Sequence, residues 1–229
     1  RGVGKTTAAR TLARCLNCLD AGPRPDPCGQ CDCCRDILAG NSPDVIEIDV
    51  ASNNSVDDIR DLRDSVRYMP ARGRYKVYIV DEVHMLSAGA FNALLKTLEE
   101  PPPHVLFIFA TTELQKVPDT VRSRCQGFDF RRLLTDEIRT RIGVICAKEK
   151  HTIDDAALFV LAKRADGSMR DGLSLLDQVV SSCRGTITAT HLAEILGLVP
   201  TEAYFDLTAA ILERDARRGL EVVHGALRA

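Results

Sequence analysis

The chain opens with Arg-Gly-Val-Gly-Lys-Thr, residues 1–6, which match the end of the phosphate-binding pattern G-x-x-x-x-G-K-[ST]. In such a loop the backbone N–H groups face the phosphates, the lysine contacts the β and γ phosphates, and the hydroxyl binds magnesium. The helix that follows directs its positive end toward the same anion. The pattern predicts nucleotide contacts from Gly2, Val3, Gly4, Lys5, Thr6 and Thr7. By itself it fits a glycine turn before a chance Lys-Thr pair equally well.

An apolar strand is predicted at Lys76–Asp81 and leads directly into Glu82. Its near-continuous apolar run is typical of a strand buried in a parallel sheet. Both carboxylates would then lie at the carboxyl edge of the sheet, beside the phosphate-binding loop. There Asp81 would hold magnesium, directly or through water, and Glu82 would act as general base toward the attacking water. An acidic pair at a strand end often only meets solvent, but the two motifs in this order predict an NTPase.

Strands and helices alternate in the first part of the chain, whereas only helices are predicted after about residue 134. The predicted strands are 45–50, 76–81, 105–110 and 127–130, with helices at 7–16 and 90–100. Ser55 with Asp58, and Ser168 with Asp171, resemble helix-capping boxes, and Val56, Ile59, Leu62 and Val66 follow the first at helical spacing. Later helices are predicted at 135–150, 154–165, 168–183, 190–196, 201–213 and 216–229. This order predicts an α/β domain with a parallel sheet, followed by an all-α domain.

Six of the nine cysteines fall between Cys15 and Cys34, in a stretch rich in proline and glycine that we expect to be a loop insertion. The spacing Cys18-x9-Cys28-x2-Cys31-x2-Cys34 offers four thiolates, which suit tetrahedral zinc. Cys33 and Cys15 compete for assignment, but Cys33 leaves only one residue after Cys31, and Cys15 suits the core. Four protein ligands leave no open position, so the zinc would be structural. The alternatives are a zinc ribbon that contacts DNA, which the mixed Arg and Asp content disfavours, and an iron–sulfur cluster.

The charge balance is nearly even, with 32 acidic and 30 basic residues and a net charge of −2. It argues against a general nucleic-acid coat protein, so any contact with DNA would be local. No apolar run approaches the roughly 20 residues that cross a bilayer, and no signal peptide opens the chain, so we expect a cytoplasmic protein without a membrane span. The odd number of cysteines also argues against a secreted disulfide framework. Cys125, Cys146 and Cys183 are expected to be ordinary core or surface residues.

Taken together, the motifs resemble those of the tau/gamma clamp-loader ATPases of bacterial DNA polymerase III, which are AAA+ proteins. The resemblance covers essentially the whole chain, and the zinc insertion together with a Ser-Arg-Cys motif is specific to this kind of subunit among AAA+ ATPases. The matching segments are, in order, Gly2–Thr6, the four-cysteine insertion, Asp81–Leu86, Asn92–Pro102, Ala110–Thr112, Ser123–Cys125 and Gly167–Asp171.

The resemblance implies a particular division of the chain. An AAA+ nucleotide-binding domain would occupy residues 1–133, with the zinc insertion at 15–36. A helical lid would follow at 134–197, and the start of a helical oligomerisation domain, or collar, at 198–229. Because the first glycine of the loop and most of the collar would lie outside the sequence, we expect a segment of a longer protein that alone binds ATP weakly and does not assemble properly.

The resemblance also implies roles for four further residues. Arg124 matches the finger that reaches the ATP of a neighbouring subunit, where an arginine neutralises charge on the γ-phosphate. Arg170 matches the arginine of the second sensor and would contact ATP held by its own subunit. Thr112, or alternatively Thr111, matches the first sensor near the γ-phosphate. Without the resemblance, the sequence indicates only that Arg124 is a surface residue and that Arg170 lies in the first turn of a helix.

The implied cofactors are ATP, Mg²⁺ and structural Zn²⁺. The implied partners are the other subunits of a heteropentamer, a ring-shaped sliding clamp and primed DNA held independently of sequence. The polymerase core and the helicase would bind through a C-terminal tail beyond this sequence. Basic candidates for DNA contact fit a solvated helix face at least as well, and these are Arg60, Arg63, Arg67, Arg72 and Arg74.

Two other functions compete with clamp loading. One is a zinc-bearing scaffold whose ATPase has decayed, which the retention of Lys5, Asp81, Glu82, Arg124 and Arg170 argues against. The other is a different AAA+ machine, such as a helicase loader or a branch-migration motor. Neither machine gives a reason for the cysteine insertion or the Ser-Arg-Cys motif.

Overall fold

A computed structural model describes residues 1–20, 22–51, 62–183, 185–197 and 201–226 of the protein. The chain divides into two compact units, the first made of Arg1 and Val3–Phe130, and the second of Gly2 and the residues from Arg131 onward. The predicted boundaries at 133/134 and 197/198 stay predictions. Among the described helices, none has both the length and the apolar character needed to span a bilayer.

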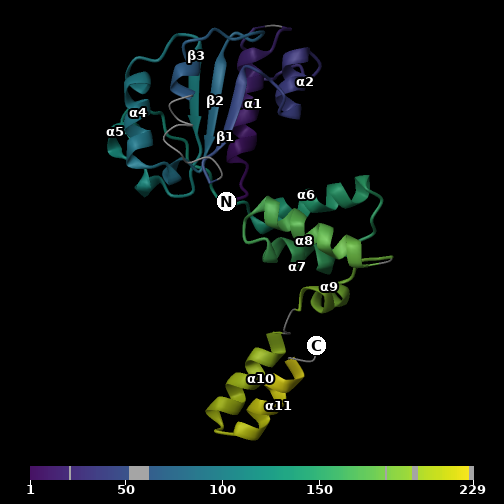
Figure 1. Ribbon diagram of the computed structural model, residues 1–229. Coiled ribbons are helices and arrows are strands. Elements are labelled where there is room, and N and C mark those ends of the chain that lie inside the picture. The colour runs from purple at the N-terminus through teal and green to yellow at the C-terminus, as the bar shows by residue number, and fades with distance from the viewer. Residues whose placement is uncertain (21, 52–61, 184, 198–200, 227–229) are drawn as a thin grey trace. The chain divides into compact units, whose positions relative to one another are not determined.

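Among its described residues, the first unit has a parallel sheet of three strands, ordered β1-β2-β3 (Figure 1). They are β1 (Val45–Asp49), β2 (Lys76–Asp81) and β3 (Val105–Phe109). Val45 lies opposite Val77 across β1 and β2, and Lys76 lies opposite Val105 across β2 and β3. In this register the carboxyl end of β2, with its acidic residues, is flanked by the ends of both neighbours. The parallel sheet and the following helices confirm the predicted fold class.

Helices cover both faces of the sheet because β2 is apolar on both sides (Figure 1). Val77 and Ile79 pack with α1 (Lys5–Asn17) and α2 (Asp32–Ala39). Tyr78 and Val80 face the opposite side and pack with α4 (Ala88–Glu99). Successive side chains of a strand point to opposite faces, so this alternation places one helical layer on each. The short elements after the strands are η1 (Val83–Met85), η2 (Leu114–Lys116) and α5 (Asp119–Arg122).

The cysteine-rich stretch is not entirely a loop. α2 begins after Cys31 and carries Cys33 and Cys34 in its first turn, and Ile37 packs into the core beside Ala13. The expectation of a loop was wrong for this part because the eight residues of α2 contain neither proline nor glycine. Gly40 ends the helix in a left-handed conformation, with φ 74°.

The predicted strand at 127–130 is also wrong, since residues 126–130 form no strand. Phe128 and Phe130 alternate as in a strand, but they are 73% and 45% exposed. No described strand pairs with them, and alternation without a ladder partner leaves extended coil. The expected capping box at Ser55 and Asp58, with Val56, Ile59 and Arg60, lies outside the described residues, whereas Leu62 and Val66 are in the core as their spacing predicts.

Two buried polar side chains hold the turn that leads into β2. Asp44 is 3% exposed and accepts hydrogen bonds from the backbone N–H groups of Ala71, Arg72 (2.8 Å) and Gly73 (2.6 Å). Asn17, at the end of α1, accepts from the N–H groups of Arg74 and Tyr75 and donates to the Tyr75 carbonyl. Because burial makes an unpaired polar group costly, these contacts fix where β2 starts.

We expect Asp44→Ala to lower the free energy of unfolding by about 3 kcal/mol, because three backbone N–H groups of the turn lose their buried acceptor. Chemical denaturation with urea measures the change. Asp129→Ala removes an exposed carboxylate of the same unit and serves as the control, with an expected change within about 0.5 kcal/mol. Equal stability of the two variants would show that the turn does not depend on Asp44.

The second unit contains a helical core and a helical pair. The core packs α6 (Thr135–Lys148), α7 (Asp155–Arg164), α8 (Met169–Ser182) and α9 (Ala189–Leu196) around residues such as Ile138, Ile142 and Leu161. Ser168 caps α8 by accepting from the N–H of Asp171 at 3.2 Å, as half of the predicted capping box.

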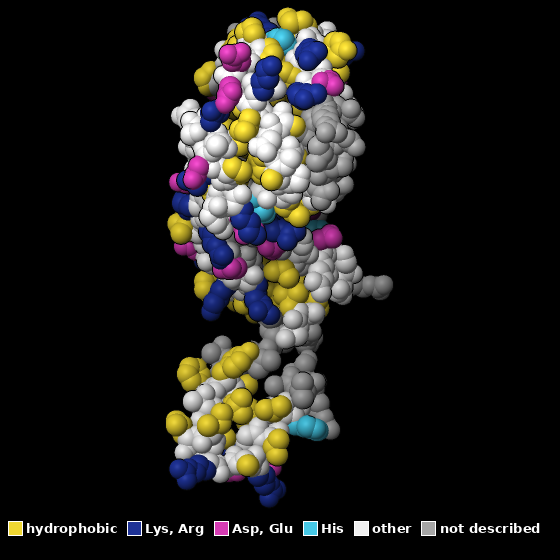
Figure 2. All heavy atoms as spheres, turned by 60° about the vertical axis from the view of Figure 1, so that its left-hand side comes forward, with side chains coloured by type: hydrophobic (Ala, Val, Ile, Leu, Met, Phe, Trp, Pro, Cys, Tyr) yellow, Lys and Arg dark blue, Asp and Glu magenta, His cyan; other side chains and the backbone are white. Residues whose placement is uncertain are grey.

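The helical pair consists of α10 (Thr201–Leu212) and α11 (Ala216–Ala226), which pack against each other. Figure 2 shows many hydrophobic side chains on the surface of this pair. Its large exposed apolar residues are Tyr204, Phe205, Ile211, Leu212, Leu220 and Val223. Apolar patches of this kind mark surfaces that bury against something else.

Candidate nucleotide site and cysteine cluster

The phosphate-binding loop leads directly into α1. Gly2 and Gly4 have φ of 69° and 94°, a region that residues with a side chain rarely adopt. Gly4 is the N-cap of α1, has no side-chain cap, and has open space where a Cβ would stand. The first N–H groups of the helix therefore border an open space, as an anion site at a helix N-terminus requires. Lys5, the first residue of α1, is half-buried at this place.

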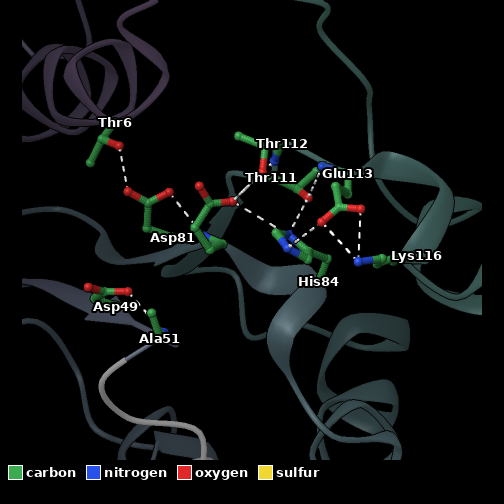
Figure 3. Close-up of polar contacts among 10 residues, drawn as sticks. Thr6, Asp49, Ala51, Asp81, His84, Thr111, Thr112, Glu113 and Lys116 are labelled. Atoms are coloured by element: carbon green, nitrogen blue, oxygen red, sulfur yellow. Dashed lines mark hydrogen bonds and ion pairs between the residues drawn. The ribbon is translucent and has the colours of Figure 1, made fainter. Parts of the chain in front are cut away.

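Thr6 and Asp81 meet at the carboxyl edge of the sheet. The Thr6 hydroxyl donates to Asp81 Oδ2 at 2.8 Å, across 75 residues of sequence (Figure 3). Asp49 ends the neighbouring strand in register with Asp81 and accepts from the N–H of Ala51. A hydroxyl and carboxylates supply the oxygen ligands that Mg²⁺ prefers, so these residues fit that ion. Sequence reasoning did not single out Asp49, although its place at a strand end was a usable signal.

Glu82 turns the chain sharply after β2. It has φ 48° and ψ 45°, a left-handed conformation that is uncommon for a residue with a side chain. Its Oε2 accepts hydrogen bonds from the backbone N–H of Thr112 at 3.2 Å and from the Thr112 hydroxyl at 3.0 Å. Strained backbone of this kind clusters at functional sites. The predicted base and one of the two candidate first-sensor residues are therefore in direct contact.

His84 and Thr111 lie beside this pair, and sequence reasoning missed His84. Its Nδ1 is 2.9 Å from the Thr111 hydroxyl and 3.4 Å from Oε2 of Glu82. Its Nε2 is 3.3 Å from Oε1 of Glu113, which also pairs with Lys116 (Figure 3). The hydrogen bond from Lys116 lowers the pKa of the Glu113 carboxyl. The signal available in the sequence was the position of His84 two residues after the predicted base.

The two predicted arginines belong to other elements of the chain. Arg124 follows α5 and pairs with Glu99 of α4 at 2.7 Å, while donating to the Thr120 carbonyl at 2.6 Å. Arg170 is exposed in the first turn of α8, in the second unit. Val3 is half-buried and Thr7 is exposed on α1. The structure thus brings Thr6, Asp81, Glu82 and Thr112 to one edge of the sheet, whereas Arg124 pairs with Glu99 and Arg170 belongs to the second unit.

The thiols of Cys18, Cys28, Cys31 and Cys34 form a cluster in which all four Sγ atoms lie within 4.8 Å of one another. The Sγ atoms of Cys28 and Cys34 are 4.0 Å apart. Tetrahedral zinc with bonds of about 2.3 Å would separate its sulfur ligands by about 3.8 Å, so the cluster fits the ion. The two rejected cysteines are elsewhere, since Cys15 contacts the Pro25 carbonyl and Cys33 is buried outside the cluster.

The surroundings of the thiols in the cluster shift their pKa values in different directions. A hydrogen bond from the backbone N–H of Cys28 lowers the pKa of Cys18 to about 6. Burial raises the pKa of Cys34 to about 12. A thiolate is the form that binds metal, and a cation among the four sulfurs would favour that form in all of them.

The fold and these contacts define a P-loop module with an AAA+-like fold, which has a cysteine cluster inserted after its first helix and is followed along the chain by a helical unit. The family model for the delta subunit of DNA polymerase III matches residues 1–134, and that for the ATPase lid domain of the DNA polymerase III clamp-loader subunit matches 137–185. The chain belongs to the clamp-loader family of DNA polymerase III.

The chain is similar to known tau subunits of DNA polymerase III. It is 47% identical to that of Bacillus subtilis over 99% of this chain and 40% of the relative. It is also 47% identical to the Escherichia coli subunit over 99% of this chain and 35% of the relative. The chain therefore spans about two fifths or less of these relatives.

A solved structure supports the fold alone. The Holliday junction branch migration motor RuvB of Thermotoga maritima superposes with a TM-score of 0.60 at 17% identity, over 92% of this chain and 65% of that chain. An identity this low carries no function across, so the resemblance to a branch-migration motor stops at the architecture.

Proposed function

We propose that the protein is the ATP-driven motor subunit of a clamp loader, which places the sliding clamp on primed DNA during chromosomal replication. The observation that carries the proposal is the contact between Thr6 and Asp81, with Glu82 and Thr112 bonded beside it. This arrangement suits phosphoryl transfer, where catalysis consists of positioning and charge stabilisation. The tau subunits that the chain resembles support the same function.

ATP would bind along the loop at the start of α1. The N–H groups of residues 2–7 would face the phosphates, and the Lys5 ammonium would neutralise the β and γ phosphates. Thr6 and Asp81 would hold Mg²⁺, whose charge would offset that of the phosphates. Arg170 of α8 would contact the nucleotide held by the same subunit.

Hydrolysis would depend on Glu82 and on an arginine from a neighbour. Glu82 would accept the proton of the attacking water while Thr112 holds one of its oxygens. Arg124 would act in the ATP site of the next subunit of the assembly. Its pairing with Glu99 is a surface ion pair, with side chains 35% and 50% exposed, so it is weak enough to be exchanged for a phosphate.

Assembly would bring this subunit together with the other clamp-loader subunits, the clamp, and DNA held by its backbone. The exposed apolar residues of α10 and α11 support burial against other subunits. The cysteine cluster would hold structural zinc, and a cytoplasmic location follows from a role in bacterial replication. The polymerase core and helicase would be reached through parts of the longer protein.

The test is Lys5→Ala in the full-length protein, assembled with its partner subunits. We expect the dissociation constant for ATP to rise about 10- to 100-fold, since a charged contact to phosphate contributes roughly 1.5–3 kcal/mol. Hydrolysis stimulated by clamp and primed DNA should be lost at ATP concentrations that saturate the wild type. Lys163→Ala removes an exposed lysine of α7 and is the matched control. If neither the clamp nor primed DNA stimulates ATP hydrolysis by the wild-type assembly, the proposed function is contradicted.

A further inference from the structure

We propose that His84 is a positioning residue for ATP hydrolysis, which fixes Oε2 of Glu82 together with Thr112 so that Oε1 is the oxygen presented to the attacking water. This inference rests on the proposed function, because it concerns the orientation of the proposed base. It adds a residue that neither the loop nor the strand-end motif contains.

His84 lies in η1 with its side chain only 9% exposed, between two carboxylates. Nδ1 faces Oε2 of Glu82 at 3.4 Å, and Nε2 faces Oε1 of Glu113 at 3.3 Å. Each ring nitrogen therefore meets an oxygen of a different acidic residue. An imidazole held at both ends has little freedom to rotate, so it can act as a fixed spacer between the two carboxylates.

The far end of this chain of contacts is anchored on η2. Lys116 Nζ lies 2.8 Å from Oε2 and 2.9 Å from Oε1 of Glu113, so the lysine holds the carboxylate whose Oε1 also faces His84. The Thr111 hydroxyl bonds the N–H of Glu113 and the Nδ1 of His84, so it ties the turn after β3 to the ring (Figure 3). The histidine therefore lies between two carboxylates, and Lys116 pairs with the second of them.

The two oxygens of Glu82 are treated differently. Oε2 receives the N–H and hydroxyl of Thr112 and faces His84, whereas within the described parts of the chain no hydrogen bond reaches Oε1. A carboxylate turns easily about its last torsion, which has a broad two-fold profile. Contacts to Oε2 restrict this rotation of the Glu82 carboxylate. Because the carboxylate is already oriented before the reaction, the entropy cost of orienting it is not part of the barrier to hydrolysis.

Two replacements of His84 would each retain a different one of its contacts. Asparagine at this position places its amide close to the position of Nδ1, so it keeps a donor toward Glu82 but cannot reach Glu113. Glutamine extends toward the position of Nε2, so it keeps a donor toward Glu113 but loses the contact with Glu82. A positioning role predicts that Asn preserves hydrolysis better than Gln, whereas a role in packing alone predicts no such order.

The experiment measures kcat, KM for ATP and ATP affinity in the assembled full-length protein, for the wild type and for His84→Ala, His84→Asn and His84→Gln. We expect His84→Ala to lower kcat about 10- to 100-fold with the dissociation constant for ATP within about twofold of the wild type. His84→Asn should recover most of that loss and His84→Gln little of it. Thermal unfolding of each variant identifies any that fail to fold.

Three outcomes would overturn the inference. They are an unchanged kcat in His84→Ala, equal kcat in the Asn and Gln variants, and a loss confined to ATP affinity. If His84→Ala does not fold, the order of Asn and Gln decides alone. If Glu82→Gln hydrolyses ATP as fast as the wild type, the base is another group and His84 has no base to orient. The proposed function itself would fail only if the wild-type assembly showed no hydrolysis stimulated by clamp and DNA, so the two failures are distinguishable.

Discussion

Glu82→Gln is expected to lower kcat for ATP hydrolysis by about 10²- to 10⁴-fold in the assembled full-length protein, which is the usual contribution of a general base. The amide has nearly the shape of the carboxylate and can still accept from the N–H and hydroxyl of Thr112. It cannot take a proton from water at neutral pH. The turn at residue 82 should therefore keep its form while the chemical step is lost.

ATP binding separates this effect from a general loss of the site. Glu82 is absent from the proposed phosphate and magnesium contacts, which come from the loop, Thr6 and Asp81. The dissociation constant for ATP should stay within about threefold of the wild type, so the variant should accumulate the ATP-bound assembly. A nucleotide-binding titration and a single-turnover assay measure the two quantities on the same sample.

Glu149→Gln is the matched control, because Glu149 is an exposed carboxylate at the end of α6. It should leave both kcat and affinity unchanged. A Glu82→Gln assembly that turns over ATP within threefold of the wild type would assign the base to another group. A loss of ATP binding together with turnover would show instead that Glu82 supports the site structurally.

The sequence alone was sufficient for the parts of the site that follow from sheet geometry. Asp81 ends an apolar strand and Thr6 follows a glycine loop, and parallel strands bring such ends to one edge. The fold class followed from the same alternation of strands and helices. The cysteine spacing likewise singled out the four thiols that the structure brings together. The catalytic roles of these residues stay predictions.

Other features depend on backbone turns that no periodicity encodes. His84 meets Glu113 only because Glu82 adopts a left-handed conformation and the chain turns again after β3. Asp44 and Asn17 are buried polar residues whose partners are backbone N–H groups of a distant turn. The strand expected at 127–130 failed for the converse reason, since its pattern was correct and its ladder partner was missing among the described strands.

Replacement of Cys34 by serine is expected to remove bound zinc from the protein and to loosen the insertion. Metal binding contributes about 10 kcal/mol or more to the folding of small zinc modules, because the ligands are not gathered in the unfolded chain. Cys34 is buried in the first turn of α2, so its loss also releases the N-terminal end of that helix. Elemental analysis of the purified protein measures zinc per chain, and hydrogen exchange over residues 18–40 measures the loosening.

The change should stay local to the insertion. Asn17 ends α1 next to Cys18, and the 13 residues of that helix place the phosphate-binding loop about 20 Å away along its axis. ATP affinity in Cys34→Ser should therefore remain within about threefold of the wild type, as expected for a structural metal. A strong zinc chelator added to the wild type should cause the same loss of protection from hydrogen exchange in the insertion and should leave the affinity for ATP unchanged.

Cys33→Ser is the matched control, since Cys33 is the adjacent residue on α2, is equally buried, and lies outside the cluster. It should retain full zinc and lose only the roughly 1–3 kcal/mol that an unpaired buried hydroxyl costs. Equal zinc loss in the two variants would show that the metal is not held by the predicted set. If the purified wild type contains iron and absorbs visible light, the four cysteines hold an iron–sulfur cluster and not zinc. Four thiolates are suitable ligands for either group.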